Sequence, residues 1–277
     1  MKCLLLCAIL VSCFCFTISE NPEEHIVGGN VATSKLFPWM SLVEAFWKGQ
    51  VFSYCGGALI SRDYVLTAAQ CVVGSTSLTI WLGAHNISAP TEFGRVKLYG
   101  DVFFVPDGYN DVFYDDDIAL VHLARPVTLS PYINFIGLST DQELDFTPGN
   151  AGVVPGWGFI RQGANKMNDV LMYSFNEVAA TSVCETRYGA GWMTPKKACV
   201  STTGGRGPCY GDAGGPLVKQ LEDGTLQVMA IFSFLDTDSC IKGFPVGFTK
   251  VAPYLEWMYN VSGIQPFRQP AAHQIHH

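Results

Sequence analysis

The chain has 277 residues, of which 48% are hydrophobic and only 15% are charged, and its formal net charge is −7. This length allows one large domain or two small ones, and this composition excludes long disordered, collagen-like and highly charged proteins. The acidic balance, with no cluster of Lys and Arg, argues against nucleic acid and against an anionic membrane surface as partners. We therefore expect a folded globular protein.

The N-terminus has the features of a secretion signal. Lys2 precedes the apolar run from Leu4 to Phe16, and small residues at Thr17 and Ser19 precede a cleavage point. We expect a signal peptide over residues 1–19 and a secreted, extracellular mature chain. A membrane anchor is the alternative, but the apolar run is shorter than the roughly 18–20 residues that a span requires.

The cysteines agree with export. Four of the 10 cysteines lie within residues 1–19, which leaves an even set of six in the mature chain. An even set in an oxidising compartment predicts disulfides rather than a zinc site, because no CxxC pair occurs. The number of cysteines does not decide which of them pair. The six are Cys55, Cys71, Cys184, Cys199, Cys209 and Cys240.

Short strands dominate the chain. Residues 77–82 alternate, with Leu78, Ile80 and Leu82 on one face, and residues 226–232 alternate again. Similar short runs, separated by turn residues, occupy residues 96–105, 118–123 and 152–157. This pattern predicts an all-β protein, either a sandwich or a barrel.

The C-terminal part contains the one convincing helix. Val251, Tyr254, Leu255 and Met258 are spaced to share one face, which predicts a helix over 251–262. A polar stretch over residues 139–150 is a candidate connector between two halves. Residues 264–277 show no periodicity, and we expect a flexible tail.

Two glycosylation sequons are present. They are Asn86-Ile87-Ser88 and Asn260-Val261-Ser262. In an exported chain either asparagine is a candidate for an N-linked glycan.

Four motifs occur in a fixed order along the chain. They are Ile26-Val27-Gly28-Gly29, then Cys55 to Ile60 with Leu66 to Cys71, then Asp117-Ile118-Ala119-Leu120, then Gly211 to Pro216. Together they resemble the chymotrypsin-like serine proteases of the S1 family over residues 26 to about 261. The stretch 82–87 is most similar to insect digestive members.

The resemblance implies the architecture. It implies an all-β fold of two packed antiparallel six-stranded β-barrels, over about 26–140 and 141–250, with the C-terminal helix completing a domain over 26–263. A cleft would lie between the barrels. The implied disulfides are Cys55–Cys71, Cys184–Cys199 and Cys209–Cys240.

The resemblance also identifies the positions of the catalytic triad. Hydrolysis in this family needs a serine that attacks, a histidine that carries the proton and an aspartate that orients the histidine. The matching residues here are Ala213, Gln70 and Asp117. A methyl group cannot attack a carbonyl, and a neutral amide cannot act as a general base. We therefore expect a catalytically inactive homologue, or pseudoprotease, in which Asp117 is a buried acceptor for Gln70. An engineered serine-to-alanine change is an alternative, but the second change at Gln70 favours natural loss.

Further positions follow from the same resemblance. Gly211 and Ala213 match the residues whose N–H groups form the oxyanion hole. The specificity pocket would have no charge at its base, and branched side chains should narrow it. Its expected residues are Gly207 at the base, Ser233, Phe234 and Leu235 along one wall, and Val246 on the other.

Activation in this family frees the amine of the residue that matches Ile26, which then pairs with the aspartate that matches Asp212. The residue before Ile26 is His25, where trypsin-activated members have Arg or Lys. We therefore expect a short pro-segment over residues 20–25 that stays attached unless another protease removes it.

We expect no cofactor and no metal. The calcium loop of the family needs two acidic residues, and the stretch from Gly83 to Lys97 offers only Glu92. Asp115 and Asp116, next to the triad aspartate position, should face solvent.

The sequence therefore predicts a secreted, inactive serine protease homologue that acts by binding a protein, as a regulator, decoy or effector of extracellular proteolysis. The partner would be a protease, a protease inhibitor or a host protein. The alternative is a weak or unconventional hydrolase that uses the remaining oxyanion hole. The sequence does not indicate the oligomeric state.

Overall fold

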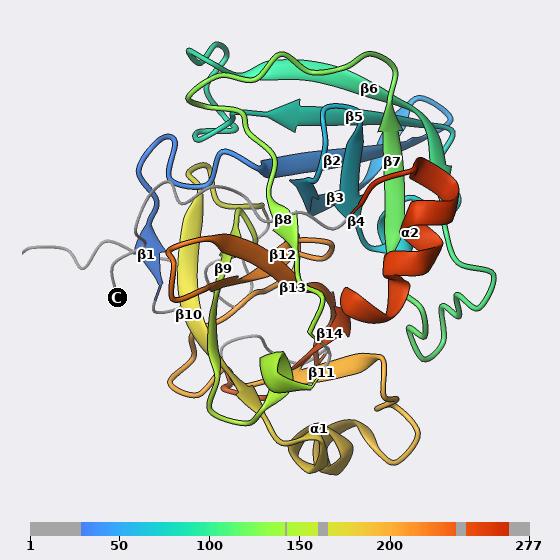
Figure 1. The fold of residues 1–277 in the computed structure, drawn as a ribbon. Helices are drawn as coiled ribbons and strands as arrows, with labels where there is room; N and C mark the ends of the chain where they lie inside the picture. Colours follow the sequence, from blue (N-terminus) through green and yellow to red (C-terminus); the bar gives the residue numbers. More distant parts are fainter. Residues whose placement is uncertain (1–28, 142, 160–165, 237–241, 266–277) are drawn as a thin grey trace, which may run out of the picture.

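The computed structural model describes residues 29–141, 143–159, 166–236 and 242–265, and it contains two β-barrels stacked one above the other (Figure 1). The first is closed in the order β2-β3-β4-β7-β6-β5, with antiparallel neighbours throughout. Its strands are β2 (Met40–Trp47), β3 (Gln50–Leu59), β4 (Tyr64–Thr67), β5 (Ser77–Leu82), β6 (Val96–Phe104) and β7 (Ala119–Leu123).

The second barrel follows the order β10-β11-β14-β13-β12-β9 and is closed by the pairing of β9 with β10. Its strands are β9 (Ala151–Gly156), β10 (Met172–Ala179), β11 (Lys197–Val200), β12 (Pro216–Gln220), β13 (Leu226–Phe234) and β14 (Val246–Lys250). Two short strands from the first half of the chain join it, because β1 (Asn30–Val31) pairs with β10 and β8 (Gly137–Leu138) pairs in parallel with β13. The expected fold of two six-stranded antiparallel barrels is confirmed.

The strand pattern seen in the sequence corresponds to burial in the barrels. In β5, Leu78, Ile80 and Leu82 are all buried, while Ser77 is exposed. In β13, by contrast, all nine residues are buried, since this strand lies between two neighbours and is covered on both faces.

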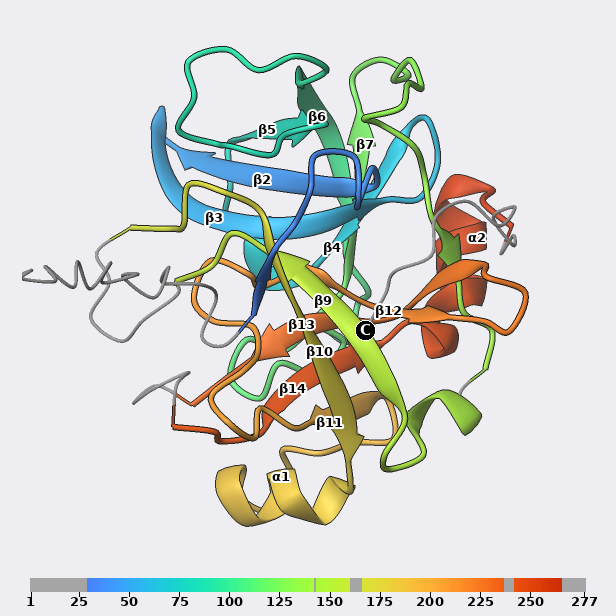
Figure 2. The same cartoon turned by 90° about the vertical axis from the view of Figure 1, so that its left-hand side faces the viewer.

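The helices lie outside the barrels (Figure 2). Helix α1 (Thr181–Tyr188) precedes β11, and α2 (Leu255–Ser262) follows a 3-10 turn over Ala252–Tyr254. Tyr254 and Met258 of this C-terminal segment belong to the same apolar cluster as the core of the first barrel, so the end of the chain holds the two barrels together. No helix in the described ranges has the length and apolar character needed to cross a membrane. Two further 3-10 turns cover Ala69–Cys71 and Leu144–Phe146.

Glycines allow the two barrels to touch backbone to backbone. A Cβ atom on Gly56 of β3 would lie 2.8 Å from the Cα atom of Gly215, and the N–H of Gly56 donates to the carbonyl of Ala213 at 2.8 Å. Gly214 has a φ of +80°, and a Cβ there would lie 2.2 Å from the hydroxyl of Thr67. Only glycine fits such a close approach, so this contact fixes the turn that carries Ala213 against the first barrel.

Two of the expected disulfides are confirmed. Cys55 is bonded to Cys71 and Cys184 to Cys199, at sequence separations of 16 and 15 positions. Cys209 is also disulfide-bonded, but its expected partner, Cys240, lies outside the described residues.

Candidate functional site

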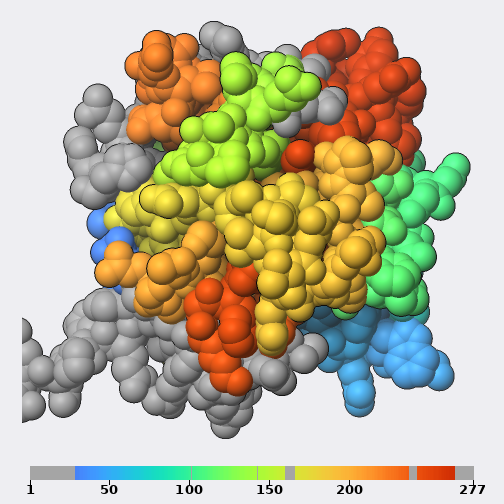
Figure 3. Space-filling view, turned by 90° about the horizontal axis from the view of Figure 1, so that it is seen from below, coloured from blue at the N-terminus to red at the C-terminus, as the bar shows by residue number. Residues whose placement is uncertain are grey.

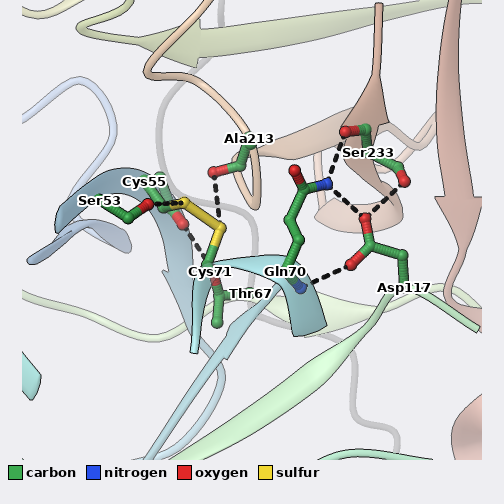
Figure 4. The surroundings of a disulfide bond; sticks show 9 residues. Ser53, Cys55, Thr67, Gln70, Cys71, Asp117, Ala213 and Ser233 are labelled. Carbon is green, nitrogen blue, oxygen red and sulfur yellow. Dashed lines mark hydrogen bonds between the residues drawn. A yellow bond between two sulfur atoms is a disulfide. The ribbon is translucent and has the colours of Figure 1, made fainter. Parts of the chain in front are cut away.

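The residues expected at the triad positions come from separate loops of the two barrels and meet where the barrels face each other (Figure 4). Gln70 lies in the 3-10 turn that follows β4, and Asp117 lies just before β7, so both belong to the first barrel. Ala213 lies in the turn before β12, and Ser233 lies near the end of β13, so both belong to the second.

Asp117 is fully buried, and both of its carboxylate oxygens accept hydrogen bonds. Oδ1 accepts from the backbone N–H of Gln70 at 2.9 Å, whereas Oδ2 accepts from Gln70 Nε2 at 2.6 Å and from Ser233 Oγ at 2.5 Å. Gln70 Nε2 also donates to the carbonyl of Ser233 at 2.7 Å. The expectation that Asp117 accepts from Gln70 is therefore met by two separate bonds.

Burial and hydrogen bonding act on Asp117 in opposite directions. Burial raises the pKa of the carboxyl, because it penalises the charged form, while the bonds from Ser233 and Gln70 lower it. The net pKa is raised. Gln70 contributes an N–H donor to this carboxylate but no group that titrates near neutral pH.

The amide of Gln70 has a second polar end. Its nitrogen is directed at Asp117 and Ser233, while its oxygen points away from Asp117 on the side of Ala213 (Figure 4). Within the described part of the chain, the N–H groups of Gly211 and Ala213 have no hydrogen-bond partner. The site therefore combines backbone donors, an amide acceptor and a methyl group.

A cleft of about 610 Å³ opens around this site. The cleft is lined by Ser53, Tyr54, Cys55, Gln70, Val112, Tyr114, Arg187, Tyr188, Trp192, Cys209, Tyr210, Gly211, Ala213, Phe232, Ser233, Phe234, Leu235 and Asp236. No histidine occurs among these described lining residues.

The cleft contains only part of the expected specificity pocket. Ser233, Phe234 and Leu235 line it, but Gly207 and Val246 do not. Val246 is only 2% exposed and pairs with Val200 between β14 and β11.

An aromatic wall, formed by Tyr114, Tyr188, Trp192 and Phe234, lines one side of the cleft. The ring of Phe234 lies 5.0 Å from that of Tyr188, 5.3 Å from that of Trp192 and 6.2 Å from that of Tyr114, centroid to centroid. Of the four, only Phe234 was predicted from the sequence as a residue of the cleft. Trp192 lies in a glycine-rich turn outside any predicted strand. A large aromatic residue at such a position is not needed to fill a barrel core, and this was the signal in the sequence that could have indicated a role in the cleft.

A buried ammonium group holds this wall in place. The Lys197 side chain is 2% exposed, and its Nζ lies 2.7 Å from Asp115 Oδ1. The same Nζ donates to the carbonyls of Phe113 and Trp192, each at 2.7 Å. Figure 3 shows the segment before β7 (green) lying against the segment that leads into β11 (yellow to orange). Lys197 thus connects two loops that belong to different barrels.

A second lysine makes a parallel connection. Asp116 Oδ1 accepts from Lys196 Nζ at 2.8 Å and from the hydroxyl of Tyr254 at 2.6 Å. Burial alone would raise the pKa of Asp116, but the hydrogen bonds from Lys196 and Tyr254 outweigh it, and the pKa is lowered. The expectation that both acidic residues face solvent is wrong for Asp116, whose side chain is 17% exposed and accepts from Lys196 and Tyr254. The Asp115 side chain is 35% exposed and forms an ion pair with the buried Lys197.

Asp212 is a second buried carboxylate next to the cleft. Its Oδ1 accepts from the N–H of Gly158 at 2.7 Å and its Oδ2 from the N–H of Cys209 at 3.0 Å. Burial raises its pKa to about 7, although these two bonds oppose the shift. Ile26, the expected partner of Asp212, lies outside the described residues.

The remaining candidate residues lie elsewhere. Neither sequon asparagine lines the cleft, since Asn86 lies in the loop between β5 and β6 and Asn260 lies in α2. Across the described ranges, no three side chains of His, Cys, Asp or Glu come together in a group that could hold a metal ion.

Comparison with known proteins gives one family. The family model described as Trypsin matches residues 26–258. Brachyurin of Leptuca pugilator is 35% identical over 243 residues, covering 87% of this chain and 100% of its own. A collagenase of Hypoderma lineatum is 32% identical over 249 residues, covering 90% of this chain and 91% of its own.

A solved structure agrees. The structure titled HL collagenase superposes with a TM-score of 0.75 at 26% identity, over 87% of this chain and all of that one. The arrangement of the two barrels, the two disulfides and the family match together establish that this chain belongs to the trypsin family of chymotrypsin-like serine proteases and their homologues.

Proposed function

We propose that this chain is a non-catalytic member of its family that acts in the extracellular space by binding a protein partner in the cleft between its barrels. The partner is a protease, a protease inhibitor or a host protein, and the chain acts on it as a regulator, decoy or effector of proteolysis. The observation that carries the proposal is the contact of Gln70 with Asp117 beside Ala213. These three residues occupy the positions where the family has its catalytic groups.

The chemistry of the cleft supports this function. The Ala213 side chain is a methyl group. Gln70 donates an N–H to Asp117, as a triad histidine would, but its other end is an amide oxygen that is not basic enough to take a proton from a nucleophile. Loss of either the serine or the histidine of such a triad lowers turnover by about 10⁶-fold in a protease of another fold.

The character of the cleft supports protein binding. Aromatic side chains are enriched at protein interfaces, where they give large contact areas at a low cost in conformational entropy. In the aromatic wall they are held by the Lys197 contacts before any partner arrives, so little ordering is needed on binding. The charged lining residues Arg187 and Asp236 form an ion pair with each other. The disulfides are consistent with an extracellular location.

A weak or unconventional hydrolase is the rival. It would use the unpaired N–H groups of Gly211 and Ala213 together with a hydroxyl on the cleft wall. The hydroxyl of Ser233 is buried and donates to Asp117, and that of Ser53 lies 3.5 Å from the sulfur of Cys55. Neither hydroxyl is hydrogen-bonded to an imidazole in the described chain, so the rival lacks the activated nucleophile that the reaction needs.

An activity comparison separates the two functions. The unaltered chain and the double variant Gln70→His, Ala213→Ser are assayed on a mixed peptide library by mass spectrometry. We expect no cleavage by the unaltered chain above that of a heat-unfolded sample. Cleavage by the unaltered chain at the rate of the double variant would refute the proposal.

A binding experiment tests whether the chain binds a protein partner in the cleft. A protein inhibitor of trypsin-family proteases is titrated into the unaltered chain and into Ala213→Arg, whose long side chain fills the floor of the cleft. We expect saturable binding by the unaltered chain and at least about tenfold weaker binding by the variant. Capture of cleaved or intact proteases from extracellular fluid, with the same variant as control, distinguishes the remaining partner classes. Equal retention by both would show that the cleft is not the binding surface.

We also propose that residues 20–25 stay attached in the secreted protein, since His25 is not a site for a trypsin-like activator. N-terminal sequencing of secreted material tests this. A chain that begins at Ile26 would contradict it.

A further inference from the structure

The two glycosylation sequons differ in the conformation that the chain gives them. Asn86 lies in the loop between β5 and β6, whereas Asn260 lies in the last turns of α2. The transferase that modifies a sequon must bring the asparagine amide and the serine hydroxyl together, so a sequon whose local structure holds the two groups in contact is favoured over one whose helix holds them apart.

The backbone and the side-chain oxygen of Asn86 are fully engaged. Its N–H donates to Glu92 Oε1 at 3.0 Å, and its carbonyl accepts from Arg95 Nη1 at 3.1 Å. Its Oδ1 accepts from the N–H of Ser88 at 3.0 Å, from the hydroxyl of Ser88 at 2.8 Å and from the N–H of Ala89 at 3.2 Å. This is an Asx turn, which brings the amide and hydroxyl of the sequon into contact.

The side-chain nitrogen of Asn86 is the one polar group of this residue that these hydrogen bonds do not involve. Its Nδ2 has no hydrogen-bond partner within the described residues, and the contacts between Asn86 and Ser88 lie at the exposed surface. Nδ2 is the atom to which an N-linked glycan is attached.

Asn260 is exposed but is held differently. Residues two apart in an α-helix do not face each other. The hydroxyl of Ser262 donates instead to the carbonyl of Met258 at 2.5 Å and accepts from the N–H of Ile264 at 3.2 Å. The amide and hydroxyl of this sequon therefore do not meet.

A groove of about 290 Å³ begins beside Asn86 on the outside of the first barrel. Ile87, Ser88 and Ala89 form one edge of it, and Glu44 and Trp81 come from β2 and β5. Trp81 Nε1 is buried with no hydrogen-bond partner. The backbone of Glu44 is paired in the sheet, whereas its carboxylate has no hydrogen bond or ion pair within the described part of the chain.

We propose that Asn86, and not Asn260, carries an N-linked glycan, and that the first sugar of this glycan lies in the groove beside Trp81. In the transfer, Nδ2 forms a bond to C1 of the first sugar of a lipid-linked oligosaccharide pyrophosphate. The bond from C1 to the pyrophosphate oxygen breaks, and Nδ2 loses a proton. The attached sugar can pack its apolar face on the indole, beside Arg95 Cζ and Lys97 Nζ, which lie 5.2 and 5.1 Å from the ring centroid, and its hydroxyls can bond to the Glu44 carboxylate.

The first test assigns the modification site. The full chain is secreted from a eukaryotic cell and treated with a peptide-N-glycosidase in heavy-oxygen water, so that each formerly glycosylated asparagine becomes a labelled aspartate. We expect the label at Asn86 alone, its loss in Asn86→Gln and in Ser88→Ala, and no change in Asn260→Gln. Label at Asn260, or none at Asn86, would overturn the proposal.

The second test asks whether the sugar occupies the groove. Protein trimmed to a single N-acetylglucosamine is compared with unglycosylated protein from an oxidising bacterial periplasm, where Asn86 is unchanged. We expect the trimmed form to melt about 2–4 °C higher, as an extra contact of moderate strength would give in a chain of this size.

A matched pair of variants completes this test. The difference in melting temperature between the two forms should vanish in Trp81→Leu and persist in Tyr99→Leu, which removes an exposed aromatic ring that does not line the groove. Each variant is compared with itself, so its own loss of stability does not affect the result. A difference that survives Trp81→Leu, or is absent from the unaltered chain, would show that the sugar lies outside the groove.

Discussion

Gln70 Nε2 lies 2.6 Å from Asp117 Oδ2 and 2.7 Å from the carbonyl oxygen of Ser233, so one neutral amide donates to acceptors from both barrels. A buried carboxylate needs such donors, because an unsatisfied charged group in the interior is costly. The amide therefore stabilises the junction of the barrels at the place where the family carries out hydrolysis.

The first prediction concerns this amide. In Gln70→Leu the Asp117 carboxylate loses a donor and the Ser233 carbonyl loses another, and we expect the free energy of unfolding to fall by about 1–3 kcal/mol. Gln70→His retains one N–H donor and should lose less than half as much. Urea unfolding of the three proteins measures both values, and equal losses in the two variants would show that the hydrogen bonds of Gln70 do not stabilise the fold.

A second prediction separates the two neighbouring lysines. Lys197 is buried and contacts three acceptors, so Lys197→Met should lower the free energy of unfolding by about 3–5 kcal/mol, the cost of leaving a partner charge and carbonyls unsatisfied. The Lys196 side chain is 48% exposed, and Lys196→Met should cost less than about 1 kcal/mol. Unfolding in guanidinium chloride, run side by side, measures the difference. A cost at Lys196 that matches the cost at Lys197 would contradict the assignment of the buried lysine as the main connection.

The strands of the barrels could be predicted because burial leaves a local pattern. Leu78, Ile80 and Leu82 alternate along β5 and point into the core. The turn that carries Ala213 was also predictable, since Gly211 to Pro216 form a contiguous motif that carries the family resemblance. Each of these features depends on residues that are near one another in the sequence.

The connections between the barrels could not be predicted in the same way. Asp116 bonds to Lys196, which lies 80 positions further along the chain, and no spacing rule joins an acidic run to a pair of lysines at that distance. The prediction that Asp116 faces solvent failed for this reason. The aromatic wall could not be predicted for the same reason, because its four side chains come from three segments that are far apart in the chain.

The third prediction concerns pH. An aspartate in an unfolded chain has a pKa near 3.9, whereas burial raises the pKa of Asp212 to about 7 in the folded chain. Between these values the folded state holds a proton that the unfolded state has lost. The contribution of Asp212 to stability is therefore greatest below about pH 4 and declines as the pH rises to about 7, at up to about 1.4 kcal/mol per pH unit.

Comparison with Asp212→Asn isolates this contribution, because the variant cannot titrate there. The difference in unfolding free energy between the two proteins, measured by urea from pH 4 to pH 8, should change steadily and level off above about pH 7. A constant difference across this range would show that the carboxyl is ionised throughout.

The last prediction connects the aromatic wall to partner binding. Large aromatic side chains at the centre of an interface often contribute about 2 kcal/mol or more each, and Trp192 is held in place by the bond from Lys197 to its carbonyl. Trp192→Ala should therefore weaken binding of the protein inhibitor by at least about tenfold, mainly through faster dissociation. Val112 also lines the cleft but is 63% exposed and lies outside the wall, so Val112→Ala should change the affinity less than about twofold.

A third variant tests preorganisation of the aromatic wall. Lys197→Met leaves all four aromatic side chains present, so it should weaken binding only if the Lys197 contacts must hold the wall in place before the inhibitor binds. Surface plasmon resonance on the three variants would separate contact from preorganisation, and unchanged affinity in Trp192→Ala would place the binding surface away from this wall.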